Sequence, residues 1–199
     1  MRAATLPLCI GLLVPVTLAA QDPRLERRLD AGTRAAVVAV IDSARAAGLP
    51  IEPLVDRALE GAAKHADSAR IVAAVSLLAT ELATARAALG PSSSPPELDA
   101  GASALRAGVR PSDLTQLRQR RPQSLTVALA ALTDLVVSGV PADSAAAAVL
   151  ALASSARDDQ IVDFRRAVER DIALGAPPAA AATVRVNAAV RAAGRSGKP

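Results

Sequence analysis

Apolar positions along most of the chain recur every three or four residues, which is the period of one face of an α-helix. The clearest stripe lies between residues 67 and 90. Its members are Ile71, Val75, Leu78, Leu82, Ala85 and Leu89. Weaker stripes follow at 125–136 and 161–172. No segment alternates apolar and polar residues over the length of a strand with β-branched enrichment. The pattern therefore predicts an all-α protein.

Glycine-containing junctions separate these stripes at 48–50, 108–111, 139–141 and 175–177. In each, an aliphatic residue follows the glycine and a proline comes soon after. Glycine favours the left-handed conformation that ends a helix, and proline suits the first turn of the next. These stops and starts predict nine helices. The expected ranges are 33–47, 52–64, 67–89, 96–107, 112–119, 123–138, 142–155, 158–174 and 178–192.

The last three glycine junctions are spaced like the units of helix-hairpin repeats, although no signature residues of a repeat family are present. We expect short Ala-rich helices in hairpins, arranged either as an α-solenoid-like helical-repeat array or as an irregular orthogonal bundle. The predicted segments are a signal peptide (1–20), an N-terminal helical unit (21–90), a Ser/Pro linker (91–96), a C-terminal helical-hairpin unit (97–192) and a flexible tail (193–199).

The first 20 residues have the layout of a cleavable export signal. Arg2 provides a positive start, an apolar run extends from Leu6 to Leu18, and small residues precede a polar segment. Cleavage near Ala19 or Ala20 would place the protein in the periplasm or outside a bacterial cell. Retention of the leader as an anchor is the alternative. No later stretch has the apolar length expected of a transmembrane span, so we expect none in the mature chain.

Composition limits the chemistry. Aromatic residues make up 1% of the chain, with one Phe and no Trp or Tyr, so helix packing has to rely on small side chains. The single cysteine, Cys9, lies in the leader, which leaves no thiol in the mature chain. The formal net charge of +4 comes from interleaved acidic and basic residues. Without aromatic side chains to stack on bases, nucleic acid is not an expected partner.

No residue pattern predicts a catalytic, cofactor or metal site. His65 is the only histidine and lies where the next helix is about to begin, so we interpret it as a left-handed helix stop with Asp67 as the following N-cap. The segment around Ser103 partly matches a hydrolase nucleophile motif. It lacks the second glycine and the preceding strand, which favours an ordinary helical serine.

Two groups of charged residues are the candidate interaction surface. An acidic row follows one side of the second predicted helix, and the densest basic cluster surrounds the end of a short helix. The acidic row is Glu52, Asp56 and Glu60, and the basic cluster is Arg110, Arg118, Arg120 and Arg121. Residues four apart share a helix face, so the row could bind a cation or a basic partner, although a solvated face is the simpler interpretation. The arginines could contact an anion or stabilise a helix C-terminus.

Three functions remain open at this point. The first is an exported, non-enzymatic interaction module of the bacterial envelope, whose partner is an envelope protein or an acidic polymer. The second is a small-ligand binder or enzyme with an Arg/carboxylate site between helices, which a deep pocket with perturbed carboxylates would favour. The third is a homo-oligomer, because a thin Ala-rich core gains stability by association.

Overall fold

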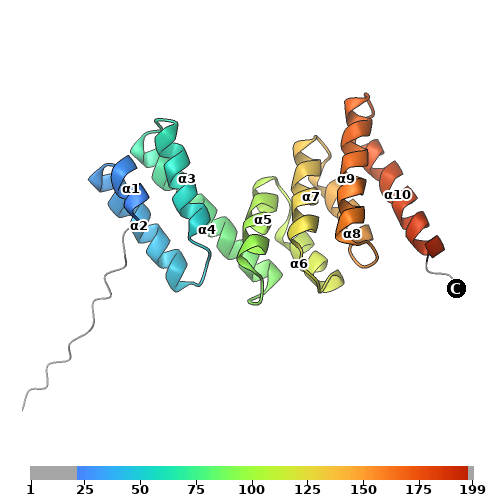
Figure 1. Ribbon diagram of the computed structural model, residues 1–199, viewed down its shortest axis with the longest axis horizontal. Coiled ribbons are helices and arrows are strands. Elements are labelled where there is room, and N and C mark those ends of the chain that lie inside the picture. The colour runs from blue at the N-terminus through green and yellow to red at the C-terminus, as the bar shows by residue number, and fades with distance from the viewer. Residues whose placement is uncertain (1–21, 197–199) are drawn as a thin grey trace, which may run out of the picture.

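The computed structural model describes residues 22–196, so the expected signal peptide lies outside the described residues. Within this range the chain forms ten α-helices and no strand, which confirms the all-α prediction (Figure 1). The helices are α1 (Pro23–Arg28), α2 (Ala31–Ala46), α3 (Glu52–Ala63), α4 (Ser68–Leu89), α5 (Pro95–Arg106), α6 (Pro111–Arg120), α7 (Thr126–Val137), α8 (Ala142–Leu152), α9 (Asp158–Ala173) and α10 (Pro178–Ser196).

Helix α1 is the element that the sequence analysis missed. The Asp22 carboxylate accepts a hydrogen bond of 2.8 Å from the backbone N–H of Arg24, and Pro23 occupies the first turn. Leu25 is buried against the following helices. An N-cap aspartate followed by proline is a recognised helix start, so the signal was present in the sequence.

Two of the predicted segments, the Ser/Pro linker and the C-terminal tail, have other boundaries in the structure than the sequence analysis expected. Only residues 91–94 of the expected linker lie outside a helix, because Pro95 and Pro96 already belong to the first turn of α5. Ser94 caps this helix, and its side chain and that of Glu97 bond reciprocally to the backbone, forming a capping box. At the other end, residues 193–196 continue α10 rather than starting a flexible tail, and Gly194 does not end that helix.

The predicted helix stops are confirmed. Gly48, Gly108, Gly139 and Gly175 all have positive φ, between 69° and 98°. His65, with φ of 54°, is the one residue other than glycine in this conformation among the described residues. Asp67 then caps α4 by accepting from the backbone N–H of Arg70 at 2.8 Å.

The helices follow one another along the long axis of the molecule (Figure 1). Even-numbered helices pack in succession, α2 on α4, α4 on α6, α6 on α8 and α8 on α10. Odd-numbered helices do the same for α1 with α3, α5 with α7 and α7 with α9. The pair α3 and α5 is the exception, since both pack extensively on α4 and make at most marginal contact with each other.

The buried apolar residues form two clusters that meet at α4 and α5. The residues of α4 from Ile71 to Leu82 contribute to the same cluster as α1, α2 and α3, whereas Leu89 at its end belongs to the cluster of the C-terminal helices. On α5, Leu98 and Ala102 belong to the N-terminal cluster and Ala104 to the other. The single phenylalanine, Phe164, is 4% exposed and packs in the C-terminal cluster. Alanines occupy many of the remaining core positions, as the composition predicted.

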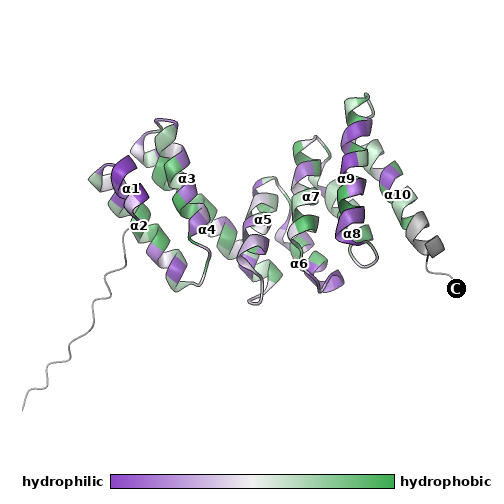
Figure 2. Ribbon diagram, in the orientation of Figure 1, coloured by the Kyte–Doolittle hydropathy of each residue, from purple (hydrophilic) through white to green (hydrophobic). Residues whose placement is uncertain are grey.

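Helix hydropathy varies strongly along the array (Figure 2). The middle of α7 is mainly apolar, whereas α9 carries many charged residues. Among the described residues, α4 alone is long and apolar enough to cross a membrane by length and composition. In this fold its apolar row packs in the protein core, with Val75 and Leu82 fully buried.

Candidate interaction groove

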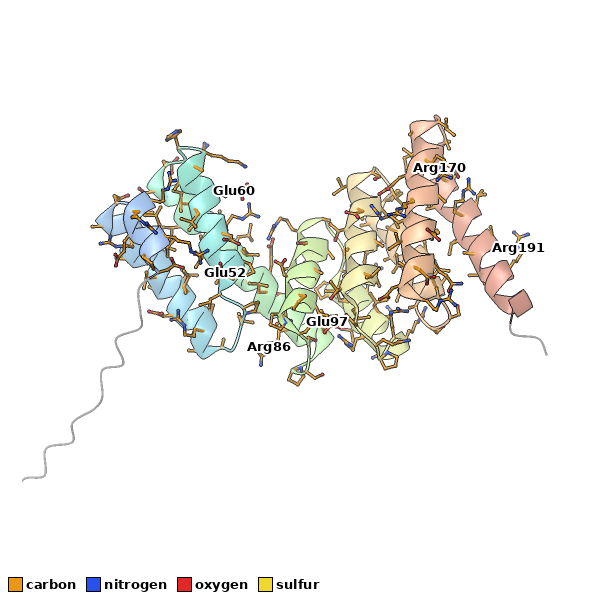
Figure 3. All side chains as sticks on the ribbon, viewed as in Figure 1. Glu52, Glu60, Arg86, Glu97, Arg170 and Arg191 are labelled. Carbon is orange, nitrogen blue, oxygen red and sulfur yellow. The ribbon has the colours of Figure 1, made fainter. Side chains whose placement is uncertain are left out.

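The acidic row on α3 lies on the solvent side of that helix, as the sequence analysis expected (Figure 3). The helix buries Leu54, Val55 and Ala58, and this places the acids on other sides. Their side chains are 44–66% exposed. The three acids are Glu52, Asp56 and Glu60.

The acids of the row differ in how firmly they are paired. Glu52 accepts a hydrogen bond of 2.7 Å from the guanidinium of Arg24 on α1. Glu60 pairs with Arg57 at 3.0 Å and with Lys64 at 2.6 Å. Asp56 has a single, longer ion pair of 3.8 Å to Arg24. The hydrogen bond from Lys64 is the main reason that the pKa of Glu60 is lowered.

A groove of about 390 Å³ separates α3 from α5 and is floored by α4. This space stays open because α3 and α5 make at most marginal contact with each other. Its lining residues are Pro53, Asp56, Arg57 and Glu60 from α3, Leu78 from α4, and Asp99 and Arg106 from α5. Two members of the predicted acidic row therefore face a site that a third acid, Asp99, completes from another helix.

The basic side chains in this groove are held by carboxylates. Arg57 pairs with Glu60, and Arg106 forms hydrogen bonds with Glu81 of α4. Glu81 is only 11% exposed, so Arg106 is anchored close to the helix surface. Asp99 is exposed and takes part in none of the ion pairs found among the side chains of residues 22–191. Sequence reasoning missed Asp99 because its relation to α3 arises only from the packing of both helices on α4.

The predicted basic cluster does not form one surface. Arg121 is 3% exposed, so the expectation that it contributes to an interaction surface is wrong. Its guanidinium donates to the carbonyl oxygens of Ala153 at 3.2 Å and Ala156 at 2.7 Å, and to the Asp158 carboxylate at 2.5 Å. A buried charge needs this degree of hydrogen bonding to be tolerated. Arg121 thus holds the turn between α8 and α9.

Arg118 has a similar structural role. Its guanidinium donates to a Glu97 oxygen at 2.6 Å, and the same oxygen accepts from the backbone N–H of Leu125 at 2.8 Å. Burial on its own raises the pKa of Glu97. The hydrogen bonds from the Ser94 and Leu125 backbone and from Arg118 outweigh it and bring the pKa down to about 2. Glu97 therefore joins α5, α6 and the start of α7 as a carboxylate.

The other two arginines of the cluster lie apart at the surface. Arg110 pairs with Asp113 at 3.0 Å and with Asp143 of α8 at 3.3 Å. Arg120 is exposed and donates to the carbonyl oxygen of Leu150 at 3.2 Å. Each of the four arginines therefore has a partner within the chain.

A second groove, of about 440 Å³, lies between α1, α2 and α3 and is mostly apolar, with Leu25, Ile41 and Val55 in its wall. Within the described residues no group of three or more His, Cys, Asp or Glu side chains is placed to hold a metal ion. Ser103 lies on α5, a helix without a preceding strand in the described chain.

Comparison of the chain with protein-family models, curated proteins and solved structures found no significant match.

Proposed function

We propose that this chain is an exported, non-enzymatic protein of the bacterial cell envelope whose stacked helices bind a protein partner. One observation carries the proposal: the layer of odd-numbered helices is interrupted between α3 and α5, which leaves a charged groove open at the surface. Arrays of helices stacked on their neighbours characteristically bind partners along an extended face, and the succession of helix contacts in this chain favours an α-solenoid-like array.

The charges of the groove support binding rather than catalysis. A general acid working near neutral pH needs a raised pKa, whereas the pKa of Glu60 is lowered by Lys64. The only histidine is a helix stop on a turn, and it lines none of the grooves described above. These features favour an interaction module over the Arg/carboxylate enzyme or small-ligand binder.

The ion pairs also favour a protein over an acidic polymer as partner. An acidic polymer would need arginines that are free to leave their present contacts. Arg121 is buried and Arg118 is held by Glu97. Homo-oligomer formation stays a prediction, supported by exposed apolar side chains such as Val137 and Leu174 at 77% and 81%.

Export and partner binding can be tested in one bacterial culture that expresses the full chain. After cell fractionation, mass spectrometry of the N-terminus should find Ala20 or Gln21 outside the cytoplasm. An intact Met1 terminus confined to the cytosol would contradict export.

Partner binding is tested by incorporating a photo-crosslinking amino acid at Pro53, which lines the groove. The expected result is a saturable adduct with one envelope protein, whose purified form then binds the purified chain. The control places the same amino acid at exposed Ala151 on α8. Equal adducts at both positions, or none at either, would contradict the proposal, and turnover of a small molecule by the purified chain would favour the enzyme alternative.

A further inference from the structure

We propose that the groove between α3 and α5 binds a basic side chain, Arg or Lys, from an extended segment of the partner, with Asp56 and Asp99 contacting it from opposite walls. This inference rests on the proposed function and adds the chemistry of the bound segment. Asp56 of α3 and Asp99 of α5 both line this one groove.

The groove is an interruption in an otherwise regular packing order. Neighbouring odd-numbered helices pack directly before and after it, α1 on α3 and α5 on α7. At the interruption the facing sides of α3 and α5 carry charged residues, Asp56 and Glu60 on one and Asp99 and Arg106 on the other. Charged walls of this kind stay hydrated in the free protein and keep the groove available to a polar occupant.

The balance of charges in the groove selects a cation. Three of its lining residues are acidic and two are basic, and both bases already have carboxylate partners. Arg106 has its partner, Glu81, outside the lining, and Glu60 likewise has Lys64, so Asp56 and Asp99 are the lining acids that are least compensated. Asp56 has only the 3.8 Å contact to Arg24, and Asp99 is exposed. The lining thus carries one more acid than base, on a chain whose net charge is +4.

The shape of the groove suits a long basic side chain. Buried Leu78 forms an apolar floor and Pro53 part of the rim, against which the methylene stem of Arg or Lys can pack while its charged end reaches the carboxylates. A volume of about 390 Å³ accommodates one or two side chains rather than a folded element. An extended peptide segment is therefore the occupant that fits both the charge and the size.

The test uses the purified chain and two fluorescein-labelled peptides of equal length. One has arginines at alternate positions in a Gly/Ser background, and the other has glutamates at those positions. Fluorescence anisotropy at low ionic strength should show binding of the arginine peptide alone. The double variant Asp56→Asn, Asp99→Asn should bind it about tenfold more weakly, as expected for the loss of two partly exposed ion pairs.

The matched control is Asp143→Asn, Asp163→Asn, which removes the same charge from exposed positions on α8 and α9. It should bind the arginine peptide as the unmodified chain does. Equal weakening in both double variants would show general electrostatic attraction and overturn the proposal, as would absence of binding to the unmodified chain. Circular dichroism melts establish that all variants fold.

The two proposals fail in different ways. If the photo-crosslinked adduct at Pro53 forms equally in the Asp56→Asn, Asp99→Asn variant, and the arginine peptide does not bind, the interaction function stands and the basic-side-chain inference is overturned. If the arginine peptide binds through the two aspartates but no envelope adduct forms, the inference stands and the envelope function is contradicted.

Discussion

The turns after α7 and α8 end two helices of similar length by different means. After α7, Gly139 has φ of 95°, and the N–H groups of Gly139 and Val140 return to the carbonyl oxygens of Val136 and Leu135. After α8 no glycine is present; the N–H groups of Ser155 and Ala156 return to the carbonyl oxygen of Leu152, and the carbonyl oxygens of Ala153 and Ala156 accept from the side chain of Arg121. The first turn is closed by its own backbone alone, whereas the second also depends on a residue that follows α6.

The two turns differ in whether their stability depends on neighbouring residues alone or also on a residue far away in the sequence. A glycine stop satisfies the last carbonyl groups of its helix wherever the sequence places it. The turn from α8 to α9 depends on the correct packing of α6, because Arg121 follows that helix directly. We therefore expect variants at Arg121 to disturb the association of several helices, and variants at Gly139 to act on one turn.

Arg121→Met should have the largest effect and lower the free energy of unfolding by about 3 kcal/mol, because buried carbonyl groups lose charged hydrogen-bond donors. Urea unfolding followed by far-ultraviolet circular dichroism measures this change. The control, Arg166→Met, alters an exposed arginine on α9 and should stay within about 0.5 kcal/mol. Equal stability of the two variants would mean that the Arg121 contacts do not hold the α8–α9 turn.

Glu97→Gln should cost about 2 kcal/mol at neutral pH, because Arg118 loses its charged partner. The folded pKa of about 2 lies below the ordinary value of 4.5, so Glu97 stabilises the fold above pH 4.5 and this contribution disappears as the pH falls toward 2. Urea titrations across that range should show a smaller loss of stability in Glu97→Gln than in the unmodified chain. Parallel pH profiles would contradict the assignment.

Gly139→Val should cost about 1–2 kcal/mol through backbone strain, since a β-branched residue disfavours positive φ. Crowding contributes little, because an added Cβ would lie 3.5 Å from the nearest side-chain atom, in Pro178. Thermal melts can compare it with Ala151→Val, which places the same side chain at an exposed helical position and should cost about 0.5 kcal/mol. If both variants have the same melting temperature, Gly139 does not act as the left-handed stop that ends α7.

His65→Gly should have the smallest effect, between no change and a gain of about 0.5–1 kcal/mol, because glycine adopts the observed φ of 54° without steric cost from a Cβ. By contrast, His65→Val should lower the free energy of unfolding, because a β-branched residue disfavours positive φ. Differential scanning calorimetry of the two variants resolves the order. A clear loss of stability in the glycine variant would show that the imidazole has a role beyond its backbone conformation.

The features that could be predicted from sequence are those that act within one turn of the chain. The glycine stops, the His65 stop and the Asp67 cap each depend on near neighbours, and the structure confirms them. Helix α1 and the capping box at Ser94 also have local signals, which were overlooked. The long-range relations had no local signal: Arg121 contacts a turn more than 30 residues away, and Asp56 and Asp99 line one groove only because their helices both pack on α4. The arginines therefore suggested a surface cluster, whereas packing draws two of them into internal contacts.

The interruption between α3 and α5 also has a mechanical consequence. The molecule resembles a beam of two parallel layers in which one layer is discontinuous at a single place, while α4 continues beneath it. Bending strain concentrates where a beam is supported on one side only, so we expect the elastic curvature of the array to change there first. Because α4 continues beneath the groove, we expect such bending to widen or narrow the space lined by Asp56 and Asp99 without unfolding a helix. We therefore expect the curvature of the array to change when the proposed partner segment enters this groove.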